Sequence, residues 1–108
     1  DTTLSYLQIN IMISKGWLNE FCLKQSENLK KKHISTHRQI DIENVYLKYI
    51  AFVQQKDVDF KMELGNIELR YFKNLIKASI ARNLWDNDLY YSILIQEDEF
   101  VQKAINSF

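Results

Sequence analysis

The chain has 108 residues, of which 46% are hydrophobic and 26% are charged, and its 14 basic side chains balance its 14 acidic ones. This composition predicts one soluble globular domain and excludes a whole-protein field that would attract nucleic acid or anionic lipid. One cysteine excludes an internal disulfide, no apolar run approaches the ~20 residues that span a bilayer, and two glycines with no proline favour helices over a sandwich or barrel.

The first predicted element is a helix that begins near residue 4 and ends within the polar stretch 26–39. Leu4, Leu7, Ile11 and Leu18 recur at helical spacing. Residues 7–13 also alternate apolar and polar side chains, which is typical of a strand, so residues 4–13 remain open between helix and strand. The apolar periodicity continues beyond Gly16 and favours the helix.

Two further helices are predicted after a polar connection at residues 26–39. Asp41 is a candidate N-cap for a helix from Ile42 to about residue 55, whose apolar side chains follow an i, i+3, i+4 pattern. The next helix is predicted at residues 63–84. Its polar residues form one narrow stripe, so we expect it to be buried on several sides at the centre of the fold.

Arg82 departs from that pattern because a helical wheel places it inside the apolar arc. A buried guanidinium needs a partner, and Glu68 lies on nearly the same line of the helix. The arginine is either a ligand-binding residue or half of a structural ion pair. We expect the structural pair Arg82–Glu68, because buried ion pairs are more often architectural than catalytic.

The last third of the chain is predicted to form two helices. Asp86 and Asp88 are suited to cap one of them, and the acidic residues 97–99 are suited to start a second, shorter one. The predicted fold class is therefore an all-α, compact bundle of four to five helices in a single domain, residues 1–108. We expect the chain to be a fragment or mature segment of a larger protein, since it does not begin with methionine.

No combination of residues predicts catalysis, a metal or a cofactor. His33 and His37 are spaced i, i+4, but a zinc site needs three or four ligands and the chain has no other histidine. Cys22 lies on an apolar stripe, where a small buried hydrophobe is the expected role. The two glycines are isolated, so no phosphate-binding loop is predicted. We therefore expect no catalytic, cofactor-binding or metal-binding residue.

The basic run is the main argument for a different function. Lys30, Lys31, Lys32, His33 and Arg38 concentrate positive charge in the stretch Lys30–Arg38. This stretch could bind an acidic partner or nucleic acid, whereas charge runs are usually solvated connections. No aromatic residue interleaves with the lysines, so stacking on single strands is not supported.

Three stretches of the sequence resemble a known family. They are SYLQINIMISKGWLNEF at Ser5–Phe21, YIAFVQQKDVDFK at Tyr49–Lys61, and the terminal stretch with IARNLW at Ile80–Trp85 and YYSILIQEDEF at Tyr90–Phe100. In this order and spacing they resemble the helical C-terminal region of bacterial carboxyl-terminal processing peptidases, the tail-specific proteases of the S41 serine peptidase family. The resemblance covers most of the chain and consists of packing motifs.

The resemblance implies a supporting role. Members of the family combine a PDZ domain, a catalytic core with a serine–lysine dyad and a helical C-terminal extension, and they are exported to the periplasm or cell envelope. No residue here matches the catalytic motif, so the chain would be a non-catalytic domain that docks on the protease core, on the PDZ domain or on a second subunit. Candidate aromatic anchors for that interface are Phe60, Trp85, Tyr90, Tyr91 and Phe108.

Overall fold

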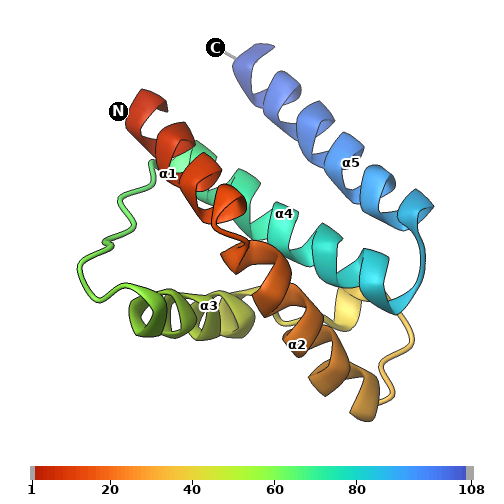
Figure 1. The fold of residues 1–108 in the computed structure, drawn as a ribbon. Coiled ribbons are helices and arrows are strands. Elements are labelled where there is room, and N and C mark those ends of the chain that lie inside the picture. Colours follow the sequence, from red (N-terminus) through yellow and green to blue (C-terminus); the bar gives the residue numbers. More distant parts are fainter. Residues whose placement is uncertain (1, 107–108) are drawn as a thin grey trace.

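The computed structural model describes residues 2–106, and every regular element in that range is helical. The elements are α1 (Thr2–Ser14), α2 (Trp17–Lys31), the 3₁₀ turn η1 (His37–Gln39), α3 (Ile42–Lys56), α4 (Asn66–Leu84) and α5 (Asn87–Asn106) (Figure 1). The predicted all-α bundle of four to five helices is confirmed, and the open question at residues 4–13 is resolved as helix.

Helix α4 is the centre of the bundle, as predicted, although it starts at residue 66 and not at residue 63. It packs against α1, α2, α3 and α5, which surround it in Figure 1. Phe72, Ile76 and Ile80 are completely buried, and Ala78 and Ala81 are buried in the contact region with α5. Small side chains let α5 approach α4 closely, while large ones fill the core between α4 and the other helices.

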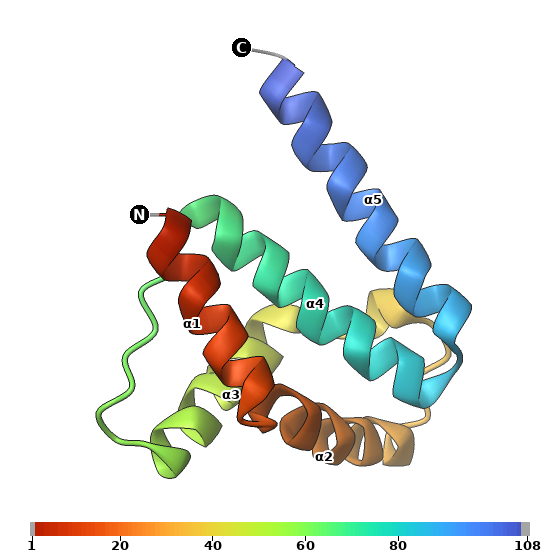
Figure 2. The ribbon, with the colours of Figure 1, turned by 45° about the horizontal axis from the view of Figure 1, so that its top comes forward.

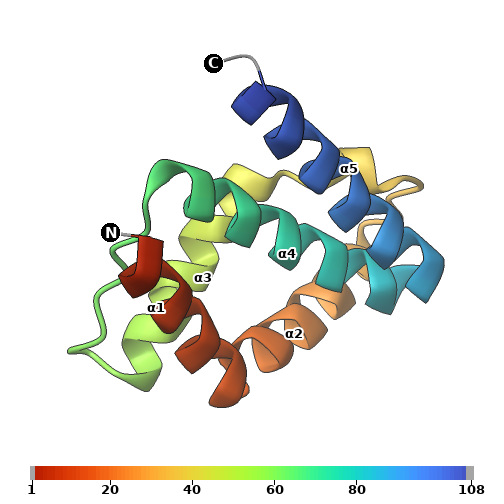
Figure 3. The ribbon, with the colours of Figure 1, turned by 90° about the horizontal axis from the view of Figure 1, so that it is seen from above.

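The predicted first helix is interrupted at Gly16, so the expectation of one continuous helix is wrong, although α2 ends at Lys31, within the predicted stretch 26–39. Gly16 adopts the left-handed conformation with φ 78°, and its carbonyl accepts the N–H of Glu20 as α2 begins. Glycine takes this conformation without the clash of a Cβ atom. Figure 3 shows the resulting bend between α1 and α2.

Helix α3 follows the predicted pattern closely. The Asp41 carboxylate accepts the N–H of Asn44 at 3.3 Å, which confirms the predicted cap. The buried residues Val45, Tyr49 and Val53 form one stripe, and the Tyr49 ring lies 5.3 Å from that of Phe72. This stripe therefore fixes α3 against α4.

The last third of the chain forms one continuous helix, so the prediction of two helices is wrong. Glu97, Asp98 and Glu99 lie in the interior of α5 and not at a helix start. The Glu97 side chain is buried and its Oε1 accepts a hydrogen bond from Arg70 Nε at 2.7 Å. Glu97 therefore bonds a neighbouring helix and does not cap the N-terminus of a helix. The second half of α5 extends away from α4 (Figure 2).

Candidate docking surface and adjoining cavity

Helix α5 buries one apolar face and exposes two large apolar side chains elsewhere. Leu89, Ile93 and Leu94 pack in the bundle, whereas Tyr91 and Ile95 lie one turn apart on another side with 61% and 56% of their surface exposed. Among the described residues α5 makes its main contacts with α4 alone. Two large apolar side chains exposed next to each other are a candidate contact for another surface.

Helix α1 also exposes apolar side chains. Its polar and apolar side chains are mixed around the helix, and Tyr6 and Ile13 are exposed on one flank while Leu4 and Leu7 are exposed on another. The packing of α1 on α2 and α4 leaves these side chains uncovered among residues 2–106.

Tyr71 connects the α1 and α5 regions. Its ring makes an edge-to-face contact with Tyr6 of α1, with centroids 6.4 Å apart. Burial raises the pKa of the Tyr71 hydroxyl, and nearby Tyr90, Tyr6 and Asp98 raise it further. Tyr71 therefore lies near side chains of both α1 and α5. We call the exposed pair Tyr91 and Ile95 on α5 the docking surface.

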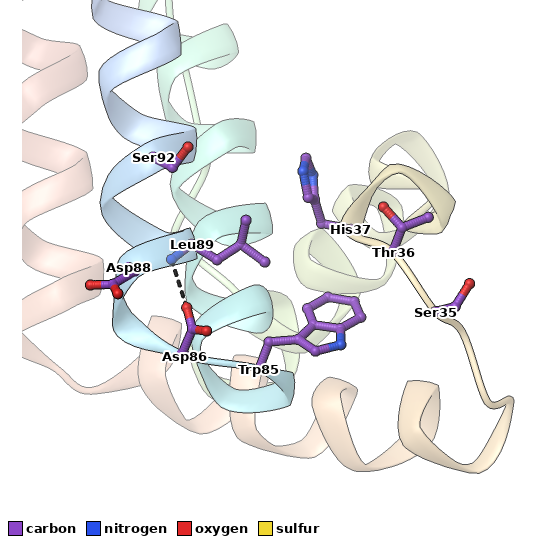
Figure 4. Close-up of a pocket in the computed structure, with 8 residues that line it drawn as sticks. All are labelled: Ser35, Thr36, His37, Trp85, Asp86, Asp88, Leu89 and Ser92. Atoms are coloured by element: carbon purple, nitrogen blue, oxygen red, sulfur yellow. Dashed lines mark hydrogen bonds between the residues drawn. The ribbon is translucent and has the colours of Figure 1, made fainter.

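A cavity of about 460 Å³ lies beside the corner between α4 and α5. Its wall combines side chains from that corner with others from the connection before α3, which are far away in the sequence (Figure 4). The lining residues are Ser35, Thr36, His37, Trp85, Asp86, Asp88, Leu89 and Ser92.

The polar groups of this cavity are unevenly satisfied. Asp86 Oδ1 accepts the N–H of Leu89 at 2.8 Å and so caps α5, as the sequence predicted. His37 Nδ1 is buried and has no hydrogen-bond partner among the described residues. Burial lowers the pKa of His37, and the nearby charges of Lys77 and Arg38 lower it further, so the ring is neutral near pH 7.

The reactive side chains of the chain are dispersed. Cys22 is buried, and burial raises the pKa of its thiol to about 12. His33 is exposed and borders a different hollow from that of His37. Within residues 2–106 no group of three histidine, cysteine, aspartate or glutamate side chains lies close enough to hold a metal ion.

The proposed aromatic anchors have different surroundings. Phe60 is half-buried, and its ring packs edge-to-face on Trp17 at 5.4 Å, so it contributes to the core. Trp85 borders the cavity with 36% of its surface exposed. Tyr90 is half-buried, Tyr91 is exposed, and Phe108 lies outside the described residues.

The expected buried pair Arg82–Glu68 is wrong. Glu68 is buried, but Arg82 is exposed and its guanidinium lies 4.4 Å from the Tyr90 ring centroid. The two residues share a helical line but are 14 positions apart, which is roughly 21 Å along the axis of α4. A helical wheel shows which side of the helix a residue faces, but it does not show how far apart two residues lie along the helix axis.

The sequence did not predict the ion pair Arg70–Glu97, which joins α4 to α5. Arg70 Nε donates to the buried Glu97 carboxylate, and the Arg70 guanidinium lies 3.6 Å from the Phe100 ring centroid. Arg70 belongs to the polar stripe of its helix, and the acidic run had suggested a helix start. One sequence signal could have indicated this pair: Glu97 lies four residues after Ile93, on the same face of α5. The signal is visible only if residues 87–106 are recognised as one helix.

The basic run lies at the end of α2 and in the following turn. Lys30, Lys31, Lys32 and Arg38 are all exposed. Lys30 and Lys31 occupy the last turn of α2, where positive charge complements the helix dipole. This placement explains two of the lysines by helix electrostatics alone.

No model of a known protein family matches the chain, and neither a curated protein nor a solved structure shows significant similarity to it. No helix within residues 2–106 is long and apolar enough to cross a membrane.

Proposed function

We propose that this chain is a non-catalytic docking domain that holds a larger polypeptide or assembly together through the docking surface. The observation that carries the proposal is the exposure of Tyr91 and Ile95, one turn apart on a helix that packs mainly on α4. Aromatic and branched apolar side chains in such a position are the residues that most often anchor protein interfaces.

The resemblance supplies the proposed partner. The stretches at Ser5–Phe21, Tyr49–Lys61 and Ile80–Phe100 resemble the helical C-terminal region of exported S41 carboxyl-terminal processing peptidases. On this proposal the parent protein is a serine endopeptidase of the periplasm or cell envelope, with its serine–lysine dyad outside this chain. The docking surface then contacts the protease core, the PDZ domain or a second subunit. Only the resemblance supports this step.

The environments of the reactive groups support a non-catalytic role. A thiol that is protonated at neutral pH and enclosed by the core is neither a nucleophile nor a metal ligand. The His37 ring has no carboxylate hydrogen-bonded to it among the described residues, so nothing orients it as a general base.

The proposal is tested by placing charge on the docking surface. Tyr91→Lys with Ile95→Lys should leave the melting temperature of the 108-residue chain within a few degrees of the original, because both side chains are exposed. In the full-length gene product the same pair should expose the domain to limited proteolysis. Leu47→Lys is the control, since Leu47 on α3 is 66% exposed and lies outside the docking surface. Equal protease resistance of both variants in the full-length protein contradicts the proposal.

A different measurement distinguishes the docking function from the alternative, which is binding of an acidic partner or nucleic acid through Lys30–Arg38. Glutamine at Lys30, Lys31 and Lys32 should leave the docking assay unchanged. Binding of nucleic acid that weakens steeply with salt and disappears in the triple variant would favour the alternative function.

A further inference from the structure

The cavity at the α4–α5 corner combines an accessible indole ring with acidic side chains. In Figure 4 the Trp85 ring lies between the first turn of α5 and the segment that carries Thr36 and His37. Tryptophan has the most negative ring face of the aromatic residues and is the best partner for a cation. Leu89 provides an apolar wall beside the ring.

The negative charge of this cavity is not neutralised within the described chain. Asp86 and Asp88 are exposed, and neither forms a salt bridge with a basic side chain of residues 2–106. Asp86 uses Oδ1 to cap α5, which leaves Oδ2 for another donor. The corner lies at the C-terminus of α4 and at the N-terminus of α5, so the opposite dipole charges of the two helix ends offset each other and the net charge comes from the two carboxylates.

The opposite wall consists of Ser35, Thr36 and His37. The His37 ring is neutral and its Nδ1 is buried, and the charges of Lys77 and Arg38 lie close enough to this wall to lower its pKa further. Lys30 and His33 border Trp85 from a neighbouring hollow and do not line the cavity.

We propose that this cavity binds a cationic group on an aliphatic stem, either a guanidinium or an ammonium, with the stem against Trp85 and Leu89 and the charge beside Asp86. The group comes either from an arginine or lysine side chain of a partner polypeptide or from a free amine. The first source rests on the proposed docking function. The cavity itself does not, because the docking surface consists of other residues.

The test uses the 108-residue chain and follows the Trp85 indole N–H by NMR during titration. The probes are N-acetyl-arginine amide, the uncharged isostere N-acetyl-citrulline amide, and N-acetyl-glutamate amide. Buried Trp17 provides an internal reference for nonspecific effects. The arginine probe should shift the Trp85 signal saturably and bind at least about tenfold more tightly than the citrulline probe, because a charge-assisted hydrogen bond is lost in the latter. Equal affinities, or tighter binding of the glutamate probe, overturn the proposal.

A matched pair of variants links the binding to the carboxylates. Asp86→Asn with Asp88→Asn removes two charges but keeps a residue that caps helices well at position 86, so α5 is preserved. Asp59→Asn with Glu63→Gln removes the same charge from exposed positions far from the cavity wall. The first variant should weaken arginine binding at least about tenfold and the second should not. Equal effects of the two overturn the proposal.

The source of the cation is distinguished by two ligands. Agmatine presents a free guanidinium, and an arginine-containing hexapeptide presents it on a backbone. Tighter binding of the hexapeptide assigns the site to a partner polypeptide, and tighter binding of agmatine assigns it to a free amine. Failure of all probes, with the Tyr91 and Ile95 result unchanged, would remove the cation site and leave the docking proposal intact.

Discussion

Replacing Arg70 with methionine tests how α5 is held on the bundle. The Glu97 side chain is only 5% exposed, and its Oε1 lies 2.7 Å from Arg70 Nε. The same guanidinium covers the Phe100 ring at 3.6 Å from the centroid. The methionine stem keeps much of the apolar contact but leaves the Glu97 carboxylate buried without its partner.

The magnitude follows from the burial of the two partners. Removing one partner of a fully buried ion pair costs roughly 4 kcal/mol. The Arg70 side chain is 49% exposed, so water relieves part of that cost in the variant. With about 0.5 kcal/mol for the lost contact with Phe100, we expect Arg70→Met to destabilise the chain by roughly 2–3 kcal/mol. The melting temperature should fall by about 10 °C or more.

Arg82→Met is the matched control for this measurement. Arg82 also lies on α4 and over an α5 ring, that of Tyr90 at 4.4 Å, but it forms no salt bridge within residues 2–106. Its loss should cost about 0.5–1 kcal/mol in urea unfolding. The double variant Arg70→Met, Glu97→Met should recover most of the stability lost in Arg70→Met. Equal costs at the two arginines, or no recovery in the double variant, would refute the reasoning.

Three further changes test other parts of the structure. Gly16→Ala should lower stability in urea by about 1 kcal/mol, because Gly16 has φ 78° although nothing lies within 4 Å of an added Cβ; an unchanged midpoint contradicts this. The pKa of His37 is lowered in the fold, so the unfolded chain takes up its proton first as the pH falls below about 6.5. Stability should therefore be fully present above that pH and decline as the pH falls below it, and it should decline less in His37→Asn; equal slopes refute this. Cys22 should react with a disulfide reagent at pH 8 only upon unfolding, since burial raises its pKa to about 12, and rapid labelling of the folded chain speaks against its burial.

The elements that the sequence predicts well are those whose signals are local. Asp41 and the stripe from Val45 to Val53 define α3 because cap and periodicity lie within one helix. The bend at Gly16 has no comparable local signal in the sequence. The apolar pattern has the same period on both sides of it, and only the backbone angle distinguishes a bend from a continuous helix.

The wrong boundary in the last third of the chain has a different cause, which is a contact between segments far apart in the sequence. Glu97 follows the rule for a helix start, yet a hydrogen bond to Arg70, 27 residues earlier, accounts for it. The cavity is also formed by segments that are far apart in the sequence. His37 and Trp85 are 48 positions apart, and no local pattern indicates that the corner after α4 meets the connection before α3.

Exposure of Tyr91 in the full-length gene product tests the docking function most directly. Hydroxyl-radical footprinting should be performed on the 108-residue chain and on the full-length protein, with Leu47 as the exposed reference. The docking proposal predicts that Tyr91 and Ile95 are modified readily in the short chain and several-fold more slowly in the full-length protein, while Leu47 is unchanged. Equal modification of Tyr91 in both proteins would contradict it.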